Sequence, residues 1–370
     1  MRNNNVLALI FANRHDEALR DMTAVRAMGS LPVGGRYRLI DFTLSGLVNA
    51  GVSRVGIVTK SHYQSLFDHI GSGKAWDLSR KHAGLTFLPS SDPRKEAYDG
   101  RIAVLSEIDS FLRHAQEEYV ILSDCHLLGN IDYDRLIDEH LESRAEISLA
   151  YKRGPFPALP GTLALTMDPS GRVTDLRVTG GEPADGCYGL GIVILRRDRL
   201  CQLVADAAGH NRLDFERDIL QKQVDTMPIH GIAITEYVEP VCSLARYFAV
   251  NMDFLNADIR AALFPAGRPV YTKVRDCAPA KYGLHADAAD SLVADGARIE
   301  GTVRRSIVFR NVVIEKGAVV ENCIVMQGAH IGAGAVLRGA VLDKNVTIKD
   351  GVVLQGAADY PMFVAKGAVV

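Results

Sequence analysis

The sequence has no long apolar run, no paired cysteine motif and no excess of charge of one sign. Without a stretch of 18 apolar residues, we expect no membrane-spanning helix. The six cysteines are scattered without a CxxC or CxxH pair, which argues against a disulfide framework or a zinc site and favours a cytoplasmic protein. A formal net charge of -2 offers no basic field for nucleic acid. These absences exclude membrane proteins, nucleic-acid binders and disulfide scaffolds.

The remaining composition is that of an ordinary folded protein, in a chain long enough for two domains. Its 370 residues exceed the usual size of a single hydrophobic core, and 48% hydrophobic residues are enough to fill two. The apolar run VLALIF is too short for the core of a signal peptide, so we interpret residues 6–11 as a buried strand. We expect a first domain over 1–265, a linker over 266–290 and a second domain over 291–370.

The first domain alternates short apolar stretches with amphipathic ones. This rhythm predicts a mainly parallel sheet with helices on both faces. In such folds ligands bind at the carboxyl ends of the strands. Further strands are expected over 145–195, around a turn at PSGR (169–172), and a long helix over 243–264 closes the domain. The expected early strands are 6–11, 54–59, 85–89 and 119–124, and the expected early helices are 39–51, with Gly51 as its C-cap, and 111–118.

Beyond Ser291 the sequence becomes rich in glycine and aliphatic residues and repeats every 17 residues. Within each period the apolar positions recur about every six residues, which is typical of a hexapeptide-type β-helix with three short faces per coil. Because one coil cannot bury its inner residues alone, stacked coils supply the core. The repeating registers are Val303/Val320/Leu337, Ile307/Ile324/Val341, Ile314/Ile331/Ile348, Ser306/Cys323/Ala340 and Gly317/Gly334/Gly351.

Three stretches resemble motifs of bacterial ADP-glucose pyrophosphorylase. They are LPVGGRYRLIDFTLSGLVNAGVSRVGIVT (31–59), HIGSGKAWDLSR (69–80) and, in the repeats, AVLDKNVTIKDG (340–351). The resemblance covers nearly the whole chain. It implies an α/β architecture, with a Rossmann-like nucleotidyltransferase domain followed by a left-handed parallel β-helix. For active family members it also implies transfer of AMP from ATP to glucose 1-phosphate, with Mg²⁺ and release of pyrophosphate.

The glycine-rich loop of active members, AGGxGTRL, is matched here by ANRHDEAL (12–19). Such a loop needs glycine so that its backbone N–H groups can approach the triphosphate. Asp16 and Glu17 instead predict negative charge where the triphosphate would lie. The three glycine positions hold Asn13, Arg14 and Asp16, and the motif arginine is replaced by Ala18.

Other motif positions have also lost their chemistry. The family's lysine beside the sugar phosphate is matched by Met28, and one of its two metal-binding aspartates by Pro240. The adenine-side motif, matched by residues 97–104, keeps only a tyrosine and a glycine. Asp124, in LSDCH, resembles the other metal aspartate and is either a retained metal ligand or a cap of the next segment. We therefore expect no intact catalytic site and no cofactor in this chain, with Mg²⁺ confined to a catalytic partner.

Basic residues around Gly34 and Gly35 match positions that flank the family's effector site. That site lies between the two domains and binds phosphorylated metabolites, phosphate or sulfate, which suit the planar fork of arginine. Ordinary solvated charges are the alternative interpretation. The candidate anion-binding residues are Arg26 and Arg38, joined from the β-helix by Arg304, Arg305 and Arg310.

The resemblance favours a GlgD-type regulatory subunit, one that makes no ADP-glucose itself but activates a catalytic homologue. We expect a hetero-oligomer, specifically a heterotetramer, that serves glycogen synthesis, and the isolated chain is compatible with a homo-oligomer. Two alternatives remain open. The chain is either a weakly active, divergent sugar-phosphate nucleotidyltransferase, or a stand-alone module that senses a sugar phosphate or a nucleotide.

Overall fold

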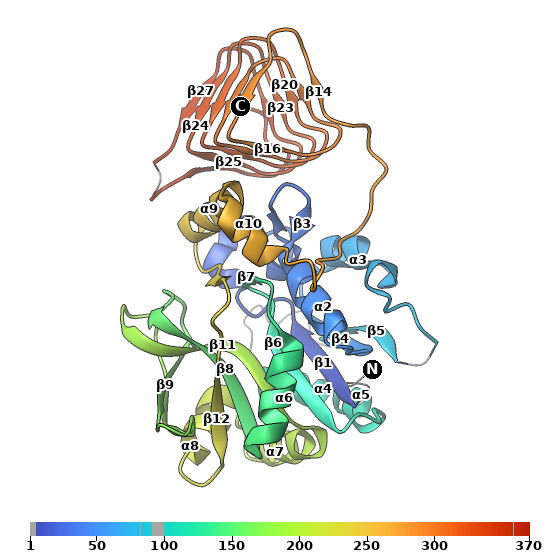
Figure 1. Cartoon of the computed structure of the whole chain (residues 1–370), viewed down its shortest axis with the longest axis vertical. Coiled ribbons are helices and arrows are strands. Elements are labelled where there is room, and N and C mark those ends of the chain that lie inside the picture. The colour runs from blue at the N-terminus through green and yellow to red at the C-terminus, as the bar shows by residue number, and fades with distance from the viewer. Residues whose placement is uncertain (1–4, 82, 91–99, 358) are drawn as a thin grey trace.

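The computed structural model describes residues 5–81, 83–90, 100–357 and 359–370. It contains a mixed α/β domain and a triangular β-helix stacked on one end of it (Figure 1). Residues 97–99 of the matched adenine-side motif lie outside the described residues. None of the helices in the described part is both long and apolar enough to cross a membrane.

The α/β domain is organised around a nine-stranded sheet, with β6, β1, β4 and β5 parallel and β11 antiparallel to β6. Strand order is β10-β9-β11-β6-β1-β4-β5, and β8 joins β11 to β12. The strands expected at 6–11, 54–59 and 119–124 are confirmed, and the one expected at 85–89 begins one residue earlier. The strands are β1 (Val6–Phe11), β4 (Arg54–Thr59), β5 (Gly84–Pro89), β6 (Tyr119–Asp124), β8 (Ile147–Pro155), β9 (Leu163–Met167), β10 (Val173–Val178), β11 (Asp185–Arg196) and β12 (Ile229–Ala233).

Helices cover both faces of this sheet, as the alternation predicts. Along β1, Leu7 and Leu9 join one core with α4, α5 and α7, whereas Ala8 and Ile10 join another with α2 and α6. This follows from the side-chain period of two in a strand. The helices are α2 (Leu39–Asn49), α3 (Gln64–Ile70), α4 (Arg101–Glu107), α5 (Asp109–Arg113), α6 (Tyr133–Ser143) and α7 (Arg197–Gly209).

Three helix predictions need correction. Helix α2 ends at the C-cap Ala50, and Gly51 follows it with φ +80°. The helix expected over 111–118 ends at Arg113, because the chain must turn to enter β6, and the Glu118 N–H pairs with the Asn5 carbonyl at 3.0 Å. The helix expected over 243–264 is broken into α9 (Leu244–Met252) and α10 (Ala257–Leu263). Asn256 causes the break, because its extended backbone and its side-chain oxygen form a new N-cap.

The C-terminal repeats form a left-handed parallel β-helix of three five-stranded sheets. Its first strand, Lys281–Tyr282, lies inside the segment expected to be a linker. The 17-residue registers hid this coil because it is shorter: Leu292 pairs with Ile307, whereas Ile307 pairs with Ile324. The sheets are β14-β17-β20-β23-β26, β15-β18-β21-β24-β27 and β16-β19-β22-β25-β28.

One face of the β-helix packs against the α/β domain. Ile307 of β19 (Ile307–Val308), Ile324 of β22 (Ile324–Val325) and Val341 of β25 (Ala340–Leu342) enter the same apolar cluster as Phe42 and Phe254. The cluster joins α2, α9 and the hairpin of β2 (Pro32–Val33) and β3 (Tyr37–Arg38). This contact forms one wall of a basic pocket described below.

Candidate functional site

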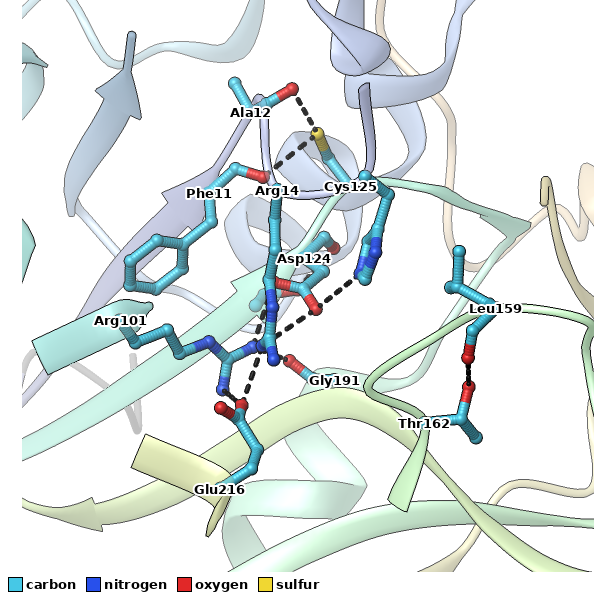
Figure 2. A network of polar contacts seen from close by, with 12 residues as sticks. Phe11, Ala12, Arg14, Arg101, Asp124, Cys125, Leu159, Thr162, Gly191 and Glu216 are labelled. Carbon is cyan, nitrogen blue, oxygen red and sulfur yellow. Dashed lines mark hydrogen bonds and ion pairs between the residues drawn. The ribbon is translucent and has the colours of Figure 1, made fainter. Parts of the chain in front are cut away.

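The carboxyl ends of β1 and β6 bring the loop 12–19 next to Asp124, where a parallel sheet normally binds its ligand. Asp124 is 2% exposed. Its Oδ1 lies 2.9 Å from Nη2 of Arg101, and its Oδ2 lies 3.3 Å from Nη1 of Arg14 (Figure 2). Arg101 also donates from Nη2 to the Gly191 carbonyl at 2.7 Å. Both oxygens of the carboxylate are therefore occupied by arginine.

A second buried carboxylate completes this network. Oε1 of Glu216 lies 2.7 Å from Nη1 of Arg14 and 3.1 Å from Nη1 of Arg101. Two guanidiniums thus meet two carboxylates, and the four charges cancel. Gly191 leaves room for the network: its φ is +73°, and a Cβ at this position would lie 2.3 Å from Oδ2 of Asp124.

The electrostatics keep both carboxylates ionised. Burial alone would raise the pKa of Asp124, but Arg101 and Arg14 hold it well below its usual value. Burial opposes ionisation of Glu216 as well, and the same two arginines lower its pKa. Around them, burial lowers the pKa of His15 and of His126, so both imidazoles are neutral near pH 7.

The residues present do not fit Mg²⁺, the metal implied by the family resemblance. Mg²⁺ prefers an octahedron of oxygen ligands. Here both oxygens of Asp124 already contact arginine, and Pro240, at the end of β13 (Val238–Pro240), supplies no carboxylate. The next donors beside Asp124 are the imidazoles of His15 and His126, which are nitrogen ligands.

The loop that replaces the glycine-rich motif is held shut by its own side chains. Asn13 accepts the Lys60 N–H at 3.0 Å and donates to Asp16 Oδ2 at 2.7 Å. Oδ1 of Asp16 accepts the Met28 N–H at 2.7 Å. Burial raises the pKa of Asp16 to about 7, so its carboxyl group is only partly ionised at neutral pH. The expectation that Asp16 presents a full negative charge to a ligand is therefore wrong, because the side chain points inward.

The remaining positions compared with the catalytic motifs have become packing residues. Met28 is buried in the apolar cluster between the domains, and Ala18 packs at the edge of that cluster. Pro240 pairs with Leu127 of β7 (Leu127–Gly129). These three positions therefore serve packing, and none offers a charged side chain.

A basic pocket lies between the β2–β3 hairpin and the β-helix. Of the five predicted anion-binding residues, Arg38 and Arg310 line it. The Arg310 guanidinium contacts Asp295 at 3.0 Å. Burial lowers the pKa of Arg38 to about 10 and that of Lys344 to about 7. The other basic residues that line the pocket are Arg36, Lys273, Arg275 and His69.

The other three predicted anion-binding residues do not line this pocket. Arg26 is 1% exposed, and its Nη2 contacts both oxygens of Asp343 in the β-helix at 2.8 Å. It therefore joins the two domains. Arg304 pairs with Asp287, and with Arg305 it precedes β19, at the opposite end of that strand from Arg310.

Sequence reasoning missed Arg101 and Glu216 in the charge network, and four cations in the pocket. Arg101 follows a glycine within the poorly matched adenine-side motif, which was the available signal. Arg36 is adjacent to Gly35, and Lys344 lies within the quoted repeat 340–351. Lys273 and Arg275 lie in the segment expected to be a linker, where no motif pointed to them.

The architecture defines a nucleotidyltransferase-type domain with a hexapeptide β-helix, and comparison with known proteins agrees. A nucleotidyl transferase family model matches residues 8–159, and a GlmU-like C-terminal hexapeptide model matches 278–360. The chain is 36% identical over 321 residues to the glycogen biosynthesis protein GlgD of Geobacillus stearothermophilus, which covers 86% of this chain and 83% of that protein.

Two further relatives extend the comparison. The GlgD protein of Bacillus subtilis (strain 168) is 31% identical over the same shares of the two chains. The glucose-1-phosphate adenylyltransferase of G. stearothermophilus is 28% identical over 325 residues, 85% of this chain and 83% of that protein. The chain belongs to the GlgD type of the glucose-1-phosphate adenylyltransferase, or ADP-glucose pyrophosphorylase, family.

Proposed function

We propose that this chain is a non-catalytic regulatory subunit that assembles with a catalytic glucose-1-phosphate adenylyltransferase and activates ADP-glucose synthesis for glycogen. The observation that carries the proposal is the neutral network of Arg14, Arg101, Asp124 and Glu216. Transfer of a nucleotidyl group needs fixed positive charge and a metal at the triphosphate. Here the arginines are spent on carboxylates of the same chain, and the metal aspartate is spent on the arginines.

The basic pocket is where we place the regulatory ligand, a phosphate-bearing metabolite or an inorganic anion. Arg38, Arg310 and Lys344 come from both domains, so an anion bound among them contacts both at once. In a hetero-oligomer, which we expect to be a heterotetramer, such a ligand biases the catalytic neighbour through the domain contact.

Pyrophosphate release tests the catalytic part of the proposal. The chain alone, its catalytic homologue alone and the two co-expressed are each supplied with ATP, glucose 1-phosphate and Mg²⁺. We expect no measurable turnover by the chain alone and a higher rate per catalytic subunit in the co-assembled sample. A robust rate from the chain alone would instead establish the divergent-enzyme alternative.

Substitutions in the pocket test its regulatory role in the same assay. Arg275→Ala removes a cation that lines the pocket, and Lys349→Ala removes an exposed lysine of the β-helix that does not. We expect Arg275→Ala to reduce the response of the co-assembled enzyme to phosphate or sugar phosphates, and Lys349→Ala to leave it unchanged. Equal responses of the two variants would remove the pocket from the proposal.

A further inference from the structure

The two histidines beside Asp124 have no part in the neutral network except for one contact. Nε2 of His15 lies 3.2 Å from Oδ2 of Asp124. His126 is 5% exposed, and its Nδ1 has no hydrogen-bond partner among the described residues. The two imidazole rings meet edge to face with centroids 4.2 Å apart. An unpaired buried nitrogen is costly, so a partner for it is expected.

We propose that His15, Asp124 and His126 bind a divalent transition-metal ion of the Zn²⁺ or Co²⁺ type. One ligand atom from each residue lies within 4.8 Å of the other two. Two imidazoles and one carboxylate are a donor set that suits zinc, cobalt and nickel, whereas Mg²⁺ selects oxygen. The misfit to Mg²⁺ described above thus has a positive counterpart, because the donors around Asp124 suit a different metal.

The geometry is close to a tetrahedral site. Donor atoms about 2.0–2.1 Å from a tetrahedral ion stand roughly 3.3 Å apart. The separation of His15 Nε2 and Asp124 Oδ2, 3.2 Å, already matches that value. His126 completes the set by a small side-chain rotation toward them. A solvent molecule takes the fourth position from the pocket that these residues share with Gly161 and Thr162.

The two arginines do not prevent binding, because each has a second partner. Arg14 contacts Asp124 Oδ2 at 3.3 Å but Glu216 at 2.7 Å, so it keeps the shorter contact when a metal takes Oδ2. Arg101 stays on Oδ1 and orients the carboxylate, as an outer-shell partner does in metal sites. Glu216 and Asp124 balance the two guanidiniums, so the ion enters a site without net charge.

Titration with Co²⁺ tests the proposal, because this ion absorbs visible light strongly in a tetrahedral site. The metal-free full-length chain, without a polyhistidine tag, is titrated, and bound metal is counted by mass spectrometry. We expect one Co²⁺ per chain, displaced by Zn²⁺ and unaffected by millimolar Mg²⁺. His126→Gln and His15→Gln should each weaken binding by at least about tenfold.

The matched control is His285→Gln, which changes an exposed histidine of the β-helix and should leave Co²⁺ binding unchanged. Circular dichroism shows whether each variant is folded, and His126→Gln is the safer of the two because the Nδ1 atom it removes has no partner. The absence of the visible band, or equal affinity in wild type and His126→Gln, would overturn the proposal. The readout is independent of turnover, so it stands or falls separately from the proposed regulatory role.

Discussion

Asp124 and Glu216 are buried carboxylates whose only compensation comes from two arginines that are distant in the sequence. A buried ion pair adds little net stability, but removing one partner leaves an uncompensated charge. The network is therefore costly to break one residue at a time. This is the property expected of a former ligand site that has been filled by the chain's own side chains.

We expect Asp124→Ala to destabilise the protein by about 3–5 kcal/mol, because Arg101 is fully buried and loses its charged acceptor. The free energy of unfolding in urea measures this loss. Glu17→Ala, which removes an exposed carboxylate, serves as the control and should change stability by less than about 0.5 kcal/mol. A loss below about 1 kcal/mol for Asp124→Ala would mean that the network is already broken in solution.

At this scale the sequence predicted which groups are missing but not which have replaced them. Motif comparison identified Met28, Pro240 and the lost glycines, because each loss is visible at one position. The pairing of Arg14 with Glu216 joins residues 202 positions apart and depends on the whole sheet. The same limit explains Arg26, whose partner Asp343 becomes visible only when the two domains are stacked.

At the scale of single elements, periodicity was a good guide to type and a weaker guide to ends. Strands β1, β4 and β6 match the predicted bounds because each is a continuous apolar run between polar residues. The break between α9 and α10 was missed because the helical apolar pattern continues across Asn256. The short first coil of the β-helix was missed because it departs from the 17-residue period.

Asn256 offers a direct test of that break. Its side-chain oxygen accepts the Asp258 N–H at 2.8 Å. Asn256→Ala should cost about 1 kcal/mol by removing the N-cap, whereas Asn256→Asp should retain most of the stability. Thermal unfolding of the three proteins measures the difference. If the alanine variant is as stable as the wild type, the cap does not fix the start of α10.

At the scale of the whole molecule, the domain contact sets the chemistry of the basic pocket. Lys344 comes from the β-helix and Arg38 from the α/β domain, so their proximity exists only in the stacked arrangement. Burial, followed by the charges of Arg38 and Arg26, lowers the pKa of Lys344 to about 7. Asp343 opposes this shift, and Lys366 adds to it. The lysine is thus half protonated near neutral pH, and a bound anion favours its charged form.

Anion affinity should therefore fall as pH rises from 6 to 8, by roughly tenfold if one proton is coupled to binding. Sulfate is the best probe, because its own charge is constant over this range. Isothermal titration of the full chain at several pH values gives the affinity. Lys344→Met should bind sulfate weakly and with little pH dependence, whereas Lys349→Met should behave like the wild type. Burial lowers the pKa of His69, which also lines the pocket, so its imidazole is neutral in this window.

The ligand-free protein should show the opposite trend in stability. Because the folded state lowers the pKa of Lys344 from 10.5 to about 7, the unfolded chain binds more protons between these values. Stability contributed by this group therefore increases as pH rises from about 7 toward 10.5. Sulfate affinity that falls while ligand-free stability rises would identify the same buried amine in both measurements. Sulfate affinity that does not change with pH would show that the bound anion is held by the arginines alone.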